Sequence, residues 1–180
     1  PYGDPSHRRP ALPRAAWFFY ASAPNDLPFA PGTPGRGWFA SSIGVTRAAI
    51  LSLLPISPLV LALNQITSLR SRVWPAVREH LGLGAVPLEL DMTEWHEYSL
   101  HWGREECRFA VDGQPVMSTS HSPHGPLGFV CWMDNQFLVL TPRGRIRSGV
   151  LGIATSQWME VTDLWVSSGQ STEFGIGPVD

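Results

Sequence analysis

Short runs in which apolar and polar residues alternate make up most of the chain, and this two-residue period is typical of half-buried β-strands. Segments rich in glycine and proline separate the runs, and the 180-residue chain contains 17 of each. Such segments are typical of turns and loops. The pattern therefore predicts an all-β domain, an antiparallel β-sandwich with long connections. The predicted strands lie at 15–22, 37–44, 95–103, 106–117, 128–141 and 157–168.

The segment 46–84 departs from this pattern and predicts a helical insertion. Its first part, 46–66, is largely apolar, and Pro55 and Pro58 divide it into short pieces. Its second part has an apolar residue at every fourth position, at Leu69, Val73, Val77 and Leu81. The apolar part is about as long as a transmembrane helix. The prolines and the amphipathic second part favour instead an insertion that packs on the domain or contacts a membrane surface through 46–66.

We interpret the chain as a single domain with two irregular ends. Residues 1–13 are polar and rich in proline, and they predict an extended arm. Residues 169–180 predict a loop-like tail. The arm and the helical insertion are expected to cover sheet edges, because an uncovered edge strand invites aggregation.

Two neighbouring runs in the C-terminal half carry a family resemblance. WHEYSLHW followed by RFAVDGQPV resembles the strand pair FHxYxxxW…xFxVDGxxV of glycoside hydrolase family 16 and related concanavalin A-like jelly rolls. MEVTDLWVSS resembles the final strand of that fold, and ALPRAAWFFYAS resembles the PAxWLL strand that precedes its catalytic strand. The resemblance covers roughly residues 11–44 and 95–168. It implies a two-sheet jelly roll whose curved inner sheet forms a substrate cleft.

ELDMTE (89–94) is the first candidate catalytic segment. In the family a strand reading ExDx(x)E crosses the cleft, so the resemblance implies Glu89 as nucleophile, Asp91 as its assistant and Glu94 as acid/base. In a regular strand Glu94 would face away from Glu89 unless a bulge intervened. The family's catalytic strand lies well before the FHxY strand, whereas here Glu94 directly precedes Trp95, and the corresponding stretch PGRGWFASSIG contains no carboxylate. Two interpretations remain, a catalytic triplet and an acidic approach to the next strand.

CWMDNQF (131–137) is the second candidate site. Alternation places Trp132, Asp134 and Gln136 on one face of a predicted strand. A tryptophan is a flat apolar platform for a sugar ring or a hydrocarbon, and Asp and Gln can fix its orientation. Enclosure of Asp134 by Trp132 and the insertion would raise its pKa and suit it to acid/base catalysis. A solvated outer face is the alternative interpretation.

Further candidates come from other predicted strands. Glu160 is a second carboxylate that could oppose Asp134, and Trp158 shares its face. Trp38 is a candidate second wall of a ligand site. His96 shares a face with Tyr98, and we interpret it as a core histidine.

No metal site and no cofactor is predicted. HSPH places His121 and His124 three residues apart without a third ligand, which argues against zinc. A structural calcium ion, known in some relatives of the family, would need oxygen ligands such as Asp163. Cys107 and Cys131 lie in apolar runs and predict two buried thiols.

Charge and composition limit the classes of partner and of catalysis that the chain can have. The net charge of -2 and the pI near 6.3 argue against a nucleic-acid partner. All 13 basic residues are arginine, which we attribute to a GC-rich bacterial genome, and the absence of lysine excludes Schiff-base catalysis. The sequence begins at Pro1 without a visible signal peptide, so an extracellular and a cytoplasmic location are both open.

Three functions fit these features. The first is a carbohydrate-active protein of the family 16-like fold, either a divergent hydrolase or a non-catalytic glycan binder. The second is binding or acid/base transformation of an apolar small molecule in a tryptophan-lined pocket roofed by the helical insertion. The third is an interaction domain whose insertion docks a partner or a membrane surface. The position of the insertion relative to the predicted site discriminates among them.

Overall fold

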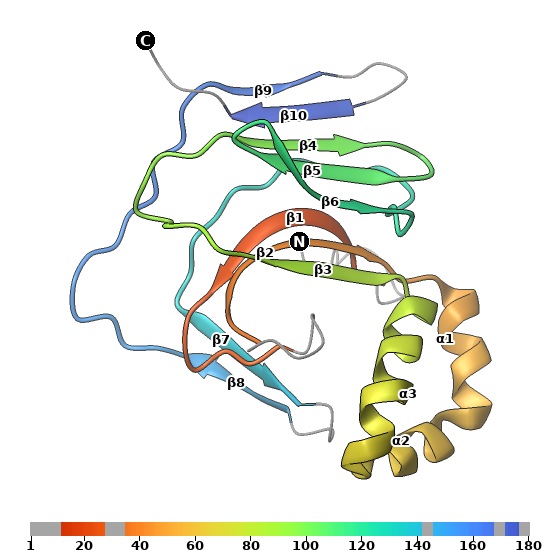
Figure 1. The fold of residues 1–180 in the computed structure, drawn as a ribbon. Coiled ribbons are helices and arrows are strands. Elements are labelled where there is room, and N and C mark those ends of the chain that lie inside the picture. The colour runs from red at the N-terminus through yellow and green to blue at the C-terminus, as the bar shows by residue number, and fades with distance from the viewer. Residues whose placement is uncertain (1–11, 28–34, 142–145, 168–171, 177–180) are drawn as a thin grey trace, which may run out of the picture.

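The molecule consists mostly of antiparallel β-sheet, consistent with the all-β class that the sequence predicts. The computed structural model describes residues 12–27, 35–141, 146–167 and 172–176, which form three sheets and a helical insertion (Figure 1). The three-stranded sheet has the order β1-β2-β3, the five-stranded sheet the order β6-β5-β4-β10-β9, and β7 pairs with β8. The strands are β1 (Arg14–Ala21), β2 (Gly37–Gly44), β3 (Leu83–Leu88), β4 (Tyr98–Trp102), β5 (Cys107–Val111), β6 (Gln114–Thr119), β7 (Gln136–Leu140), β8 (Ile146–Val150), β9 (Leu164–Val166) and β10 (Thr172–Ile176).

The hydrophobic core lies between one face of the three-stranded sheet and one face of the five-stranded sheet. Phe18 of β1 and Ala40 of β2 are cross-strand partners, so their side chains share the core face. Phe109 of β5 is 1% exposed and meets the Phe18 ring edge-on, with the ring centroids 5.4 Å apart. Cys107 and Met117 complete the buried cluster. The burial of these side chains holds the two sheets together.

The helical insertion interrupts a β-hairpin without disturbing its register. Ile43 of β2 pairs with Leu83 of β3, and the Gly44 N–H donates to the Gly82 carbonyl at 2.9 Å. The chain leaves and re-enters the sheet at adjacent points, and the helices project from this end (Figure 1). The helices are α1 (Arg47–Leu53), the 3₁₀-helix η1 (Leu54–Ile56), α2 (Ser57–Gln65) and α3 (Thr67–His80).

The predicted breaks at Pro55 and Pro58 are confirmed. Each proline lies in the first turn of a new helix, η1 or α2, where its missing N–H leaves no hydrogen bond unmade. Thr46 caps α1, because its side-chain oxygen accepts the Ala49 N–H at 3.1 Å. The stretch Arg47–Gln65 is long and apolar enough to cross a membrane by length and composition alone, and only 6% of its apolar window is buried in the molecule.

Three strands are not predicted by the sequence pattern. β3 contains Gly84 and Pro87, which are typical of turns, but β3 pairs only with β2 within its sheet, and an edge strand tolerates a proline. β8 lies between the predicted strands 128–141 and 157–168, where no strand is predicted. β10 falls in the predicted tail 169–180, yet its backbone pairs with both β4 and β9. Most of the predicted arm lies outside the described residues.

Two predicted strands are much shorter than expected. The run 128–141 forms a strand only at β7, and the run 157–168 only at β9. The segment 128–135 forms no strand, and most of its side chains are exposed. The prediction that both cysteines are buried is therefore wrong for Cys131, which is exposed, and right for Cys107; both thiols are free.

Candidate ligand-binding site

An open hollow of about 240 Å³ lies beside the start of β7 and gathers polar side chains. We call it the polar hollow. It brings together one carboxylate, three side-chain amides and a hydroxyl. These belong to Asp134, Asn135, Gln136, Gln157 and Ser22, and the segment 151–154 completes the lining.

A local turn, and not strand alternation, gathers the polar residues before β7. The Gln136 N–H donates to the Asp134 carboxylate at 3.0 Å, which bends the backbone at residues 134–136. The Asn135 amide donates to the Leu151 carbonyl at 2.7 Å, and the Leu151 N–H donates to the Asn135 carbonyl at 2.8 Å. Asp134, Asn135 and Gln136 therefore all line the hollow, although alternation would separate Asn135 from the other two.

The loop after β1 supplies the Ser22 side of the polar hollow. The Asn25 N–H donates to the Ser22 carbonyl at 2.9 Å, and the Asn25 side chain accepts the Leu138 N–H at 2.8 Å. Asp26 continues this contact, because its N–H donates to the Leu138 carbonyl and its carbonyl accepts the Leu140 N–H. The loop is thus fastened along β7, and Ser22 is held at the hollow.

A row of aromatic rings ends close to the polar hollow. Phe19 and Phe39 stack across β1 and β2 with centroids 5.3 Å apart, and Trp17 contacts Phe19 at 5.4 Å. Trp132 contacts Trp17 at 5.8 Å and is 47% exposed. Trp132 precedes Asp134 by two residues, a chain length of about 7 Å at most. An exposed aromatic surface therefore lies next to the polar groups.

The structure places the other predicted tryptophans elsewhere. Trp38 lies on the core-side face of the three-stranded sheet, where its ring contacts Tyr20 at 6.1 Å and Tyr98 at 5.7 Å. Trp132 lies on the opposite face of that sheet, against Trp17, so Trp38 and Trp132 do not share one site. Trp158 follows the lining residue Gln157 and is 76% exposed.

Asp134 is the single carboxylate among the described lining residues of the polar hollow. Glu160 lies in the same irregular segment as Gln157, is exposed and does not line the hollow. Within the part of the chain that the structure describes, Asp134 forms no ion pair. Its carboxylate is therefore oriented by the Gln136 N–H and open to a ligand.

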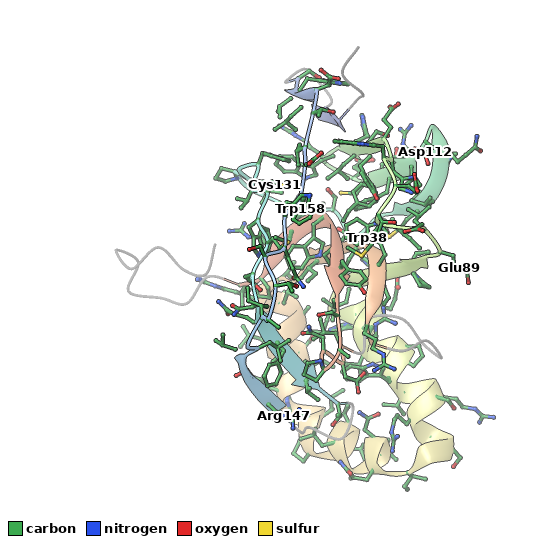
Figure 2. The ribbon with its side chains drawn as sticks, turned by 90° about the vertical axis from the view of Figure 1, so that its left-hand side faces the viewer. Trp38, Glu89, Asp112, Cys131, Arg147 and Trp158 are labelled. Atoms are coloured by element: carbon green, nitrogen blue, oxygen red, sulfur yellow. The ribbon has the colours of Figure 1, made fainter. Side chains whose placement is uncertain are left out.

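ELDMTE forms part of the loop 89–97 between β3 and β4, outside any strand. Glu89 and Glu94 are exposed, and Figure 2 shows Glu89 on the far side of the molecule from Cys131 and Trp158. Asp91 accepts the Thr93 N–H at 3.0 Å and the Thr93 hydroxyl at 2.6 Å, and these hydrogen bonds lower its pKa. Asp91 thus shapes the loop, and the three acids are not arranged along one strand.

His96 belongs to a second polar cluster, at the tip of the β5–β6 hairpin. Its Nδ1 donates to the Asp112 carboxylate at 2.7 Å, and its Nε2 faces the Asp91 carbonyl at 3.1 Å. Asp112 also accepts the Glu97 N–H at 2.9 Å. The hydrogen bond between the two side chains raises the pKa of His96 and lowers that of Asp112. His96 is thus a half-buried clasp between the loop 89–97 and the hairpin tip, outside the hydrophobic core cluster.

The histidine and the aspartate considered for metal binding, His121 and Asp163, lie outside the polar hollow. His121 forms an ion pair with Glu79 of α3 at 3.1 Å, which ties the insertion to the loop after β6. The guanidinium of Arg147 lies 5.3 Å from the centre of the Phe137 ring. No group of three His, Cys, Asp or Glu side chains that could hold a metal ion occurs among the described residues. Asp163 is exposed and has a φ of 46°.

Sequence reasoning missed Trp17, Ser22 and Gln157. The aromatic run AAWFFYAS gave a signal for Trp17, because alternation in β1 puts it on the face opposite Phe18. Ser22 and Gln157 carried no signal, since irregular segments far apart in the chain bring them together.

No protein-family model, no curated protein and no solved structure matches this chain.

Proposed function

We propose that the protein binds carbohydrate without cleaving it, at the polar hollow and the neighbouring Trp132 ring. The observation that carries the proposal is the convergence of Asp134, Gln136 and Gln157 beside an exposed tryptophan. Sugar hydroxyls need both donors and acceptors, which a carboxylate and amides supply. The apolar face of a sugar ring stacks on an indole. The hollow therefore offers both kinds of contact that a sugar requires.

The size of the polar hollow suits a small ligand. Its volume of about 240 Å³ lies below the pockets of about 300–1,000 Å³ that enclose drug-sized molecules. An open hollow of this size suits one sugar ring at the end or along the side of a glycan. The rest of the glycan would extend over the Trp132 surface.

The number of carboxylates favours binding over hydrolysis. Glycosidases need two carboxyl groups, about 5–5.5 Å apart for retention and about 6.5–9.5 Å apart for inversion. Asp134 alone is available among the described lining residues, and Glu89 lies far from this side of the molecule (Figure 2). A single acid can orient a sugar hydroxyl, but it cannot perform both steps of glycoside cleavage.

The architecture supports the proposal as an analogy. The concanavalin A-like jelly roll implied by the sequence resemblance is a two-sheet sandwich, and here a three-stranded and a five-stranded sheet enclose one core. We propose that the chain is a divergent member of this architecture. Its sugar site would lie on the outer face of the sheet that carries Trp17, away from the core.

The position of the insertion supports a glycan over an apolar small molecule. No residue of 46–84 lines the polar hollow, so the insertion does not roof it. A site without a roof stays accessible to water, and a polar ligand with a long chain tolerates this better than an apolar one. The acid and the amides that line the hollow also favour a polar ligand over an apolar one.

Tryptophan fluorescence during titration with β-glucan oligosaccharides tests the proposal. We expect saturable quenching in the wild type and a loss of most of it in Trp132→Phe. Trp165→Phe is the matched control, because Trp165 is 48% exposed, close to the 47% of Trp132, but lies on β9 of the other sheet. Its titration should keep the wild-type affinity.

Calorimetry on Asp134 variants tests the polar contacts. A hydrogen bond to a charged group contributes about 1.5–3 kcal/mol, so Asp134→Ala should weaken binding at least about tenfold. Asp134→Asn keeps an acceptor for the Gln136 N–H but removes the negative charge, so it distinguishes the effect of the charge on binding from the effect of the turn. Quenching by flat apolar ligands alone, or release of reducing sugar over hours, would contradict the proposal.

A further inference from the structure

We propose that the tip of the helical insertion docks on the surface of an anionic lipid bilayer. The apolar tip consists of large side chains in α1, η1, α2 and the α2–α3 junction, and each is between 48% and 63% exposed. These residues are Leu51, Leu54, Ile56, Leu59, Leu61 and Ile66. They extend from the C-terminal half of α1 to the α2–α3 junction. The inference is independent of the polar hollow, to which no tip residue contributes.

The exposed side chains point in several directions, and this feature favours lipid over a protein groove. Leu59 and Leu61 are two residues apart in α2, so they lie about 200° apart around the helix axis. Both are more than half exposed, at 59% and 54%. A helix that binds in a groove presents one stripe at i, i+3, i+4 and i+7. A bilayer interface can cover apolar side chains on opposite sides of a helix, whereas a protein groove covers only one side of it.

The topology favours surface docking over a membrane span. Ile43 and Leu83 are paired, so both ends of the insertion emerge on the same side of any membrane. A crossing by Arg47–Gln65 would have to return through α3, which has 14 residues and contains charged side chains, whereas a span needs about 20 apolar residues. The bent run of α1, η1 and α2 therefore fits the interface, with its apolar residues below the headgroups.

Arginines flank the apolar tip and match an anionic headgroup layer. Residues 48–69 carry no charge, while Arg47 precedes this stretch and Arg70 and Arg72 follow it. Arg70 is held at the α2–α3 junction, because its Nε donates to the Asn64 carbonyl at 2.8 Å. The insertion holds four arginines and one glutamate in a chain of net charge -2. That glutamate, Glu79, pairs with His121. Of these arginines, Arg70 and Arg72 adjoin the apolar tip and make its local charge positive, whereas Arg47 and the buried Arg78 lie at the ends of α1 and α3 nearest the sheet.

Flotation of the full chain with vesicles tests the proposal. The vesicles are phosphatidylcholine alone and phosphatidylcholine with phosphatidylglycerol. We expect co-flotation with the anionic vesicles. The double variant Leu59→Glu, Leu61→Glu should lose it, while Met92→Glu, an equally apolar-to-acid change at a residue 47% exposed in the loop 89–97, should bind like the wild type. Circular dichroism checks that each variant keeps its fold.

The charge contribution is measured separately. An arginine near an anionic surface contributes about 1 kcal/mol, so Arg72→Gln should weaken binding about fivefold and reduce its dependence on salt. Absence of flotation with both vesicle types would overturn the proposal. Concentration-dependent dimerisation that Leu59→Glu, Leu61→Glu abolishes, without vesicle binding, would also overturn it and identify a second copy of the chain as the occupant.

Discussion

His96 is held by two acceptors, one on each ring nitrogen. The Asp112 carboxylate and the Asp91 carbonyl can both accept a hydrogen bond only when the imidazole carries two protons. The charged imidazole therefore makes both hydrogen bonds and joins the two segments more strongly than the neutral form, which agrees with the raised pKa of His96. The clasp joins the loop 89–97 to the β5–β6 turn, where Asp112 and Gly113 have φ values of 51° and 72°, typical of a type I′ hairpin.

The His96–Asp112 pair predicts a pH window for stability. His96 has a raised pKa in the folded protein, so its contribution is complete below the unfolded value of about 6.5 and is lost as the pH rises through the folded pKa. Asp112 has a lowered pKa, so its contribution is present above about 3.9 and is lost as the pH falls through the folded pKa. The difference in unfolding free energy between wild type and His96→Ala should be largest between these values.

Urea denaturation at several pH values measures this difference. We expect it to shrink from about pH 5 to pH 9, as the histidine loses its proton. Asp112→Asn should remove most of the pH dependence. A difference that stays constant from pH 5 to pH 9 would show that the clasp does not depend on the charge of His96.

At the scale of elements, the β2–β3 hairpin is held in register although 37 residues separate Gly44 from Gly82. Gly82 ends the helical segment and begins the return strand with a φ of 68°. Its N–H donates to the Glu79 carbonyl at 3.0 Å, and its carbonyl accepts the Gly44 N–H. One residue therefore serves both as helix terminus and as hairpin partner.

Gly82→Ala should destabilise the protein by about 1–2 kcal/mol, because an L-residue rarely adopts this conformation. The added Cβ would also lie 3.1 Å from the Gly44 carbonyl oxygen, which adds a steric contribution. Gly128→Ala is the control, because a Cβ there would meet nothing within 4 Å. Thermal unfolding of the two variants compares them, and equal midpoints would refute the role of Gly82.

The sequence predicted those elements whose residues follow a clear local pattern of apolar and polar positions. β1, β2, β4 and the helices carry clear periodicity, and the structure has them where the sequence predicts them. β3 and β10 were missed because pairing with distant strands, and not local preference, determines them. Asp134 and Gln136 do line the hollow, but through a local turn and not through the predicted strand alternation, and Ser22 and Gln157 come from irregular segments. Asp112 was missed as the partner of His96 because the two lie 16 residues apart in the chain and come together only when β4 pairs with β5.

At the scale of the whole molecule, the polar hollow and the apolar tip belong to different parts. The hollow depends on β7, the loop after β1 and the segment 151–157, while the tip depends on the helices alone. The ion pair of Glu79 with His121 links α3 to the loop after β6. The two proposed activities should therefore be separable by removing the insertion.

Replacement of residues 45–81 by Asn-Gly tests this separation. Gly44 and Gly82 already pair, and Asn-Gly favours the two-residue turn that such a pair needs. We expect loss of the helical circular dichroism signal and of vesicle flotation, with the affinity for oligosaccharides unchanged. A shortened protein that folds but no longer binds sugar would show that the insertion supports the hollow.

The unequal burial of the two cysteines has a practical consequence. The thiol of Cys107 lies between the sheets, hydrogen-bonds to Ser122 at 3.5 Å, and has its pKa raised by burial, so it reacts poorly with electrophiles. Cys131 is exposed and directly precedes Trp132. A maleimide dye would therefore attach to the native chain at one position, beside the proposed sugar platform. The unmodified sequence thus contains its own attachment point for a fluorescent reporter of ligand occupancy.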